Sequence, residues 1–510
     1  MKKLFIDGKS LNIEDFINVA RNHYEVHLTE EAKEKMQKSR DVVEKIVENE
    51  KPVYGINTGF GKFCNVKISK EESKNLQKNL IMSHACGVGN PLKEDAVRGI
   101  MLLRANALAN GFSGIRISTV ETLLEMLNKN VIPVIPEKGS LGASGDLAPL
   151  AHMVLVMLGM GEAYYKNERL SGKEAMKKAN IKTIELEGKE GLALINGTQV
   201  MTSIGALAIY DSKILLKTTD IAISMTSEAL EGITDAYDSL VHEVRNQTGQ
   251  IITAENLRRI LNGSKNTTKQ GEKRVQDAYT LRCVPQIHGA SKDAFNYVNN
   301  VINNEINAVT DNPIIFPDED KIISAGNFHG QPVALAMDFL AIAISEMANV
   351  SERRIERLVN TEHSKLPAFL VKDGGVNSGF MIAQYAAAAL VSENKVLAHP
   401  ASVDSIPSSA NQEDHVSMGT IASRKAREII YNASRVLAIE LIAAVQAIDL
   451  RGGKEKLSPA TKSVYNLIRK NISYWEKDRE MYPDINNAAE LILNNSIVKE
   501  VENIIGEIKI

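Results

Sequence analysis

Four long amphipathic stretches constrain the fold of this chain more than any other feature. Each is rich in Ala, Leu, Ile, Glu and Lys, the stronger helix formers; they cover residues 201–230, 332–359, 379–397 and 416–450. Such runs of roughly 20 to 35 residues exceed the mean globular helix of about 11 to 12 residues. They predict a mainly α protein with a long central helical bundle.

The part of the chain before Asn196-Gly197 has a more mixed character. Residues 117–129 and 147–158 have helical apolar spacing, and breakers separate them. Residues 132–135 predict a short strand, and 183–186 with 192–195 could form a hairpin. We therefore expect an N-terminal domain over 1–200, loop-rich and mixed, and a long-helix bundle with C-terminal helices over 201–510.

Composition limits the partners of the protein. The net charge of −3 is close to balance, so neither nucleic acid nor an anionic membrane surface is indicated. One Trp and an aromatic share of 5% argue against platforms that stack nucleic-acid bases. We expect a small-molecule substrate and no nucleic-acid partner.

Acidic residues argue against export and membrane insertion. Asp7 interrupts the N-terminal segment before an apolar run develops, so this segment does not match a signal peptide. Asp338 and Glu346, or Glu440, lie within the two most apolar helical stretches. The sequence therefore predicts a soluble cytoplasmic protein with no membrane partner.

Several segments resemble known catalytic, nucleotide-binding or metal-binding motifs, but each departs from its motif at a required position. Residues 142–146 resemble a nucleophile elbow, but Asp146 occupies the last glycine position. Residues 55–62 resemble a phosphate loop with one residue too many, and residues 242–246 lack the second histidine of a zinc-protease helix. The three cysteines lack paired metal spacing; they are Cys64, Cys86 and Cys283. We expect no metal and no external cofactor.

The segment from Gly139 to Leu150 contains three adjacent residues with very small side chains, Ala143-Ser144-Gly145. Glycine allows a tight loop in which the Gly145 nitrogen can approach the Ala143 carbonyl carbon. Ring closure with loss of water, followed by dehydration of Ser144, would give a methylidene-imidazolone, an electrophile made from backbone. Taken alone, the segment is better interpreted as a glycine-rich turn before a helix.

Other polar segments with turn-like context accompany this loop. They are 53–61 (VYGINTGFG), 83–84 (SH), 194–199 (LINGTQ), 276–283 (QDAYTLRC), 326–332 (GNFHGQP) and 411–415 (NQEDH). Together with Ala143-Ser144-Gly145, the set resembles the aromatic amino acid ammonia-lyase family. The segments follow the family's order from about Tyr54 to His415.

The resemblance implies a non-oxidative elimination of ammonia through a self-made electrophile. Ala143, Ser144 and Gly145 are then the precursors of the 4-methylidene-imidazol-5-one, which improves the amine as a leaving group. Tyr54 would be the base, in an environment that favours its phenolate. Tyr279 and Asn196 would be further catalytic residues near the electrophile.

The substrate-binding residues implied by the resemblance differ in chemistry. Arg282 offers a planar fork of donors for the α-carboxylate, Gln276 lies beside that group, and Phe328 packs beside the electrophile. Glu413 can accept from an imidazole N–H, and His84 can donate or accept opposite it. This pair favours L-histidine, giving trans-urocanate, the first step of histidine degradation. The resemblance also implies a homotetramer with shared active sites.

Other functions remain open at this stage. A phenylalanine or tyrosine ammonia-lyase, or an aminomutase of the same family, would use the same electrophile, although His84 and Glu413 argue against both. A non-catalytic helical scaffold is a further alternative, which the intact Ala143-Ser144-Gly145 segment with Tyr54 and Arg282 argues against. A fumarase-like lyase would require a Gly-Ser-Ser loop that we do not find. Asp414 and His415 adjoin the site segment without an assigned role.

Overall fold

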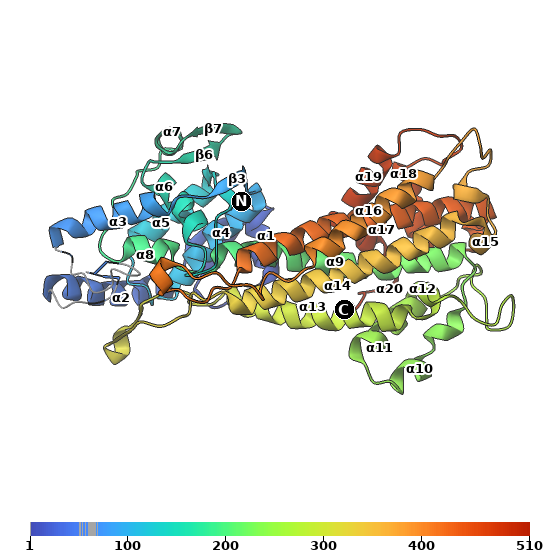
Figure 1. Cartoon of the computed structure of the whole chain (residues 1–510), viewed down its shortest axis with the longest axis horizontal. Coiled ribbons are helices and arrows are strands. Elements are labelled where there is room, and N and C mark those ends of the chain that lie inside the picture. Colours follow the sequence, from blue (N-terminus) through green and yellow to red (C-terminus); the bar gives the residue numbers. More distant parts are fainter. Residues whose placement is uncertain (1, 50–52, 54, 57, 60–67, 69) are drawn as a thin grey trace. The chain divides into compact units, whose positions relative to one another are not determined.

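The computed structural model describes residues 2–49, 53, 55, 56, 58, 59, 68 and 70–510, and its chain is mainly α (Figure 1). It divides into two compact units of separate segments. Unit 1 comprises Met1–Leu207, Asn300–Asp338 and Pro400–Arg424; unit 2 comprises Ala208–Asn299, Phe339–His399 and Lys425–Ile510. Four long helices contribute to both units: α9 (Gln199–Ala229), α13 (Val284–Glu305), α14 (Gln331–Val359) and α17 (Gly419–Arg451).

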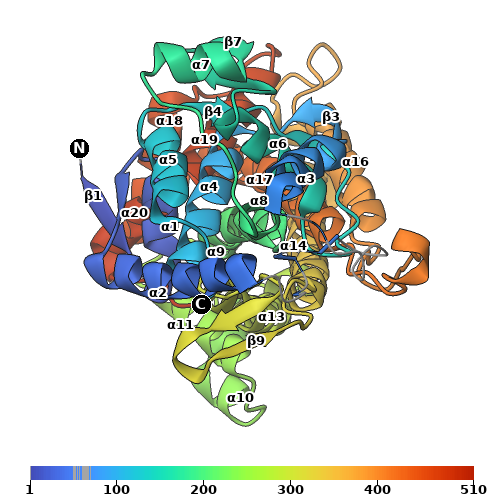
Figure 2. The same ribbon diagram turned by 90° about the vertical axis from the view of Figure 1, so that its left-hand side faces the viewer.

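Unit 1 combines helices with short strands. Its other helices are α1 (Ile13–Ala20), α2 (Glu30–Asn49), α3 (Lys70–His84), α4 (Glu94–Ala109), α5 (Ile117–Asn128), α6 (Leu147–Met157), α7 (Gly172–Lys178) and α8 (Glu190–Ile195). Helix α4 packs against α1, α2 and α5 (Figure 2). All of its residues from Ala96 to Ala109 are buried, so it forms the core of this unit.

The strands of unit 1 form small sheets. β1 (Lys3–Ile6) and β2 (Glu25–Leu28) pair in parallel, with Lys3 opposite Glu25. The other pairs are antiparallel: β3 (Val88–Pro91) with β5 (Pro136–Lys138), β6 (Glu162–Tyr165) with both β4 (Ile132–Pro133) and β7 (Glu168–Ser171), and β8 (Ile314–Phe316) with β9 (Lys321–Ile323). Each strand is too short to dominate the fold.

Unit 2 is helical, and its long helices run side by side (Figure 1). Buried charged groups join them: Asp220 of α9 lies 2.9 Å from His288 Nδ1 and 2.5 Å from Lys292 Nζ, both on α13. Arg354 of α14 donates to Glu440 of α17 over 2.6 Å. Burial raises the pKa of the Asp220 carboxyl. The neighbouring Lys292 and His288 outweigh this effect and hold that pKa below its ordinary value. These ion pairs fix the register of the helices.

Shorter helices complete unit 2. They are α10 (Ser239–Glu243), α11 (Thr248–Ile260), α12 (Tyr279–Arg282), α15 (Thr361–Ser364), α16 (Met381–Leu397), α18 (Pro459–Asn471), α19 (Tyr482–Leu493) and α20 (Ser496–Ile505). The predicted long helices are confirmed as α9, α14, α16 and α17, and those expected at 117–129 and 147–158 as α5 and α6. The domain boundary near residue 200 stays a prediction.

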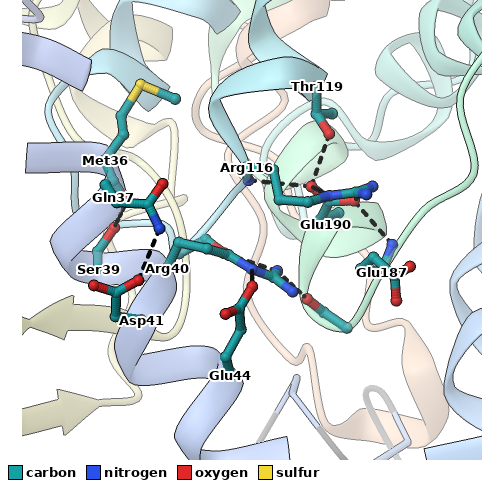
Figure 3. A network of polar contacts seen from close by, with 12 residues as sticks. Met36, Gln37, Ser39, Arg40, Asp41, Glu44, Arg116, Thr119, Glu187 and Glu190 are labelled. Carbon is teal, nitrogen blue, oxygen red and sulfur yellow. Dashed lines mark hydrogen bonds and ion pairs between the residues drawn. The ribbon is translucent and has the colours of Figure 1, made fainter. Parts of the chain in front are cut away.

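The hairpin expected from 183–186 and 192–195 is wrong, because residues 192–195 lie in α8. The buried Glu190 carboxylate at the start of α8 accepts from Arg116 Nε over 2.9 Å, Thr119 Oγ1 over 2.8 Å and Glu187 N over 2.8 Å (Figure 3). These contacts satisfy a buried charge and fix the first turn of a helix. Short apolar runs do not distinguish a strand from a buried helix.

Helix α14 is long and apolar enough to cross a membrane by length and composition, but 67% of its most apolar window is buried inside the protein. Its Asp338 accepts a hydrogen bond from Ser402 N over 2.7 Å. Burial of this kind is typical of a core helix. Asp338, whose charge argued against a membrane span, is therefore hydrogen-bonded within the protein.

Candidate active site

The loop Ala143-Ser144-Gly145 lies in unit 1, directly before α6. Gly142 and Gly145 have φ angles of 74° and 69°, in the left-handed region that favours glycine. A Cβ on Gly145 would lie 2.2 Å from the Gly197 carbonyl oxygen, so no larger residue fits without movement of backbone. The sequence folds here into a tight loop because glycine permits both the angle and this close approach.

Asp146 anchors the loop on the start of α9. Its backbone N–H donates to Gly197 O over 2.7 Å, and its carboxylate accepts from Val200 N over 2.9 Å and Met201 N over 2.8 Å. The hydroxyl of Thr420 also donates to this carboxylate. Burial raises the pKa of Asp146, although these hydrogen bonds oppose the shift. A carboxylate at a helix N-terminus is favoured by the helix dipole, so the loop is held firmly.

A later segment of unit 1 runs along the same loop. Ala143 packs with Val416 and Met418 in one apolar cluster. Met418 N donates to Leu141 O over 3.2 Å, which ties the two backbones together. This packing brings Glu413 to the Ala143-Ser144-Gly145 loop, where Ser144 Oγ lies 3.5 Å from Glu413 Oε1.

His84 is the last residue of α3, and the charge of the Glu413 carboxylate acts on it. Burial lowers the pKa of His84 from 6.5, and the charge of Glu413 opposes the shift, so the two groups are in electrostatic range. Ser83 Oγ lies 3.1 Å from His84 Nδ1. Within unit 1, the structure therefore brings Ser144 and Glu413 together, and His84 lies within electrostatic range of Glu413.

Asn196 ends α8 in a buried polar region of unit 1. Its side-chain amide donates to Asn312 O over 3.2 Å, and its carbonyl accepts from Arg104 Nη1 over 2.8 Å. Asn196 Oδ1 is buried and has no hydrogen-bond partner among the residues that the structure describes. A buried oxygen without a hydrogen-bond partner costs free energy. A donor that binds beside this atom would therefore be stabilised by it.

Phe328 is half-buried in the segment that precedes α14. The next residue, His329, stacks on His415 with ring centroids 5.7 Å apart and an interplanar angle of 8°. The segments 326–332 and 411–415 are therefore neighbours. This contact places Phe328 close to the segment that carries Glu413.

The three remaining residues lie in unit 2, in and just before α12. Gln276 is exposed, and Tyr279 is 68% exposed. The guanidinium of Arg282 lies over the ring of Tyr279, 4.7 Å from its centroid. Arg282 Nε is buried without a hydrogen-bond partner in the described part of the chain, as an arginine prepared for an anion would be.

Two buried residues hold α12 in place. Tyr237 donates its hydroxyl to Leu281 O over 2.9 Å, and burial raises the pKa of Tyr237 to about 12, so it stays a neutral donor. Asp277 accepts from Ile233 N over 2.6 Å. These contacts fix the backbone that presents Tyr279 and Arg282.

Tyr54, the predicted base, lies outside the described residues. Two residues that act through others were not predicted from the sequence: Arg104, which donates to the Asn196 carbonyl, and Thr420, which donates to the Asp146 carboxylate. A charged or polar residue within an apolar helical pattern could have indicated such residues. Such a pattern marks burial, but it does not name the partner.

Comparison with known proteins identifies the family of this chain. Residues 11–470 match the family model of the aromatic amino acid lyases. The histidine ammonia-lyase of Alkaliphilus oremlandii is 65% identical over 502 residues, covering 98% of this chain and 99% of the relative.

Two solved structures share the fold over almost the full chain. The histidine ammonia-lyase of Trypanosoma cruzi has 42% identity and a TM-score of 0.92, covering 98% of this chain and 95% of its own. A tyrosine aminomutase from Streptomyces globisporus has 36% identity and a TM-score of 0.95, covering 99% and 100%. Because the family model matches residues 11–470 and these relatives are similar over almost the full chain, the chain belongs to the aromatic amino acid lyase family.

Proposed function

We propose that this protein eliminates ammonia from L-histidine to give trans-urocanate, the first step of histidine degradation. The observation that carries the proposal is the carboxylate of Glu413 at the Ala143-Ser144-Gly145 loop, 3.5 Å from Ser144 Oγ and within electrostatic range of His84. A carboxylate accepts an imidazole N–H, whereas a phenyl ring carries no hydrogen-bond donor and a phenol ring carries only the hydroxyl at its tip. Relatives named histidine ammonia-lyase at 65% and 62% identity support the same substrate.

The residues present fit a 4-methylidene-imidazol-5-one made from Ala143, Ser144 and Gly145, with no external cofactor. Gly145 has the left-handed φ of 69° and lies against Gly197, so the loop is already tight. Once formed, this group supplies an electrophile that improves the amine as a leaving group. The anchored Asp146 keeps the loop from relaxing, and the free Oδ1 of Asn196 can receive a donor beside it.

The other residues bind the substrate and move its protons. Arg282 would hold the α-carboxylate in a charge-assisted pair, with Gln276 beside it, and Phe328 would exclude water from the electrophile. Tyr54 would take the β-proton as phenolate, and Tyr279 would act close to the amine. Glu413 and His84 would orient the imidazole ring. Orientation of this kind can supply a large part of the rate enhancement.

We also infer a cytoplasmic homotetramer with shared active sites. Gln276 and Tyr279 are exposed in unit 2, although the reaction requires them in a closed site. Large apolar side chains are also exposed on the long helices of this unit, among them Tyr297, Phe339, Ile342 and Tyr385. Exposed apolar groups of this size are typical of subunit interfaces.

The direct test is turnover of L-histidine by the purified protein without added cofactor. We expect the ultraviolet absorbance of trans-urocanate to appear together with ammonia. L-Tyrosine and L-phenylalanine should be poor substrates, and no β-amino acid should accumulate. Preferential turnover of either aromatic substrate, or formation of a β-amino acid, would contradict the proposal.

Replacing the imidazole-binding carboxylate tests the substrate assignment. We expect Glu413→Gln to lower kcat/KM for L-histidine by about ten- to a hundredfold, because an amide replaces a charged acceptor. Thermal unfolding should change little. The control Glu319→Gln removes a charge from an exposed glutamate of the same unit and should retain activity. A change in stability without a change in kcat/KM would refute this role of Glu413.

The lowered pKa of His84 predicts a specific pH dependence. Since its folded-state value lies below 6.5, His84 is neutral at pH 7 and becomes a cation only in more acidic solution. The cation would pair with Glu413 and compete with the substrate ring. We expect the ratio of wild-type to His84→Gln kcat/KM to be flat above about pH 7 and to fall several-fold toward about pH 5.

This ratio removes the titration of the substrate itself, because both proteins meet the same substrate. The control His363→Gln changes an exposed histidine of unit 2, and its ratio to wild type should not depend on pH. A flat ratio for His84→Gln as well would show that its protonation does not affect catalysis.

A further inference from the structure

The segment that presents Glu413 has an unusual backbone. Ser409, Ala410 and Asn411 are consecutive and have φ angles of 51°, 52° and 65°. None is glycine, and the left-handed region is unfavourable for most residues that carry a Cβ. Backbone strain persists only where surrounding contacts impose it, and it is concentrated at functional sites.

The contacts that close this turn are made by its two ends. Ser408 N donates to Glu413 O over 2.9 Å, and Glu413 N donates to Ser408 O over 3.3 Å. Ser408 Oγ also lies 3.0 Å from Glu413 Oε2. A carboxylate only accepts, so the serine hydroxyl is the donor.

The two oxygens of Glu413 therefore have different partners. Ser408 holds Oε2, whereas Oε1 faces Ser144 Oγ at 3.5 Å. When Ser144 is dehydrated, its hydroxyl oxygen leaves as water, and the contact to Oε1 is lost with it. Oε1 is then available to a ring N–H, while Ser408 still holds Oε2.

We propose that Ser408 is a positioning residue for the imidazole-binding carboxylate, and that the preference for rings with an N–H depends on its hydroxyl. The inference rests on the proposed function. The strained turn brings Ser408 and Glu413 side by side, and the hydroxyl selects the orientation in which one oxygen points to the substrate. Loss of the hydroxyl leaves the carboxylate in place but without a fixed direction.

Steady-state kinetics of Ser408→Ala test this with two substrates, L-histidine and thienylalanine, whose five-membered ring has no N–H. We expect kcat/KM for L-histidine to fall about tenfold, as for loss of one hydrogen bond to a charged group, and that for thienylalanine to stay unchanged. Ser408→Thr, which keeps the hydroxyl, should restore most of the loss. Ser409→Ala makes the same change at the next position and should retain the wild-type ratio.

A second measurement needs neither turnover nor a mature electrophile. In the Ser144→Ala background, calorimetry should show that Ser408→Ala weakens L-histidine binding by about tenfold, and that Ser409→Ala does not. If Glu413→Ala is also present, Ser408→Ala should have no further effect, because the carboxylate that Ser408 holds is then absent. This cycle decides the matter even where Ser408→Ala matures poorly, because it does not require the mature electrophile.

Failure of the proposed function and failure of the inference about Ser408 give different results. If wild type does not turn over L-histidine, the proposed function fails and this inference fails with it. If wild type does so but Ser408→Ala matches Ser409→Ala in kinetics and binding, the inference alone is overturned. Equal losses for L-histidine and thienylalanine would likewise overturn it, because they indicate general damage to the site.

Discussion

Ser144→Ala is expected to abolish both the electrophile and the reaction. The wild-type polypeptide should be lighter than its sequence by two water molecules, one from ring closure and one from Ser144 dehydration. Alanine has no hydroxyl to lose, so Ser144→Ala cannot form the methylidene group. We expect kcat to fall at least about a thousandfold, the order lost when a covalent catalytic group is removed.

Intact-mass measurement and urocanate formation check this result on the same samples. The control Ser118→Ala removes an exposed hydroxyl from α5 and should keep both the mass deficit and the activity. The fold should survive in Ser144→Ala, because Asp146 anchors the loop through groups that the substitution leaves intact. An active protein of unreduced mass would refute the electrophile.

The sequence was sufficient for the fold class because long stretches repeat the helical pattern many times. The helices α9, α14, α16 and α17 lie where their composition predicts them. The sequence was insufficient where a few contacts determine the secondary structure of a short segment. The segment 192–195 is apolar enough for a strand, yet the contacts of Glu190 with Arg116 and Thr119 make it a helix.

The candidate site was predicted as a set of residues rather than as a geometry. Resemblance to the family supplied Glu413, His84 and Ser144. In unit 1 of the structure, Ser144 Oγ lies 3.5 Å from Glu413 Oε1, and the charge of Glu413 acts on His84. The resemblance could not supply Ser408, because the left-handed turn that joins it to Glu413 contains no glycine to mark it. Such a turn depends on tertiary contacts, which local preferences do not encode.

Arg282→Leu is expected to have the second large effect, through loss of substrate carboxylate binding. The Nε of Arg282 is buried without a hydrogen-bond partner among the described residues, and its guanidinium is oriented by the ring of Tyr279. Hydrogen bonds between ions are roughly twice as strong as neutral ones. We expect kcat/KM for L-histidine to fall by about a hundred- to a thousandfold, mainly through KM.

Histamine separates this role from a structural one, because it keeps the imidazole and the amine but lacks the carboxylate. If Arg282 binds the carboxylate, histamine should inhibit wild type and Arg282→Leu with similar constants, although L-histidine binds the variant far more weakly. The control Arg245→Leu removes an exposed arginine of the same unit and should leave both ligands unaffected. Equal weakening of histamine and L-histidine would mean that Arg282 supports the fold of α12, since the lost contact would then not depend on a carboxylate.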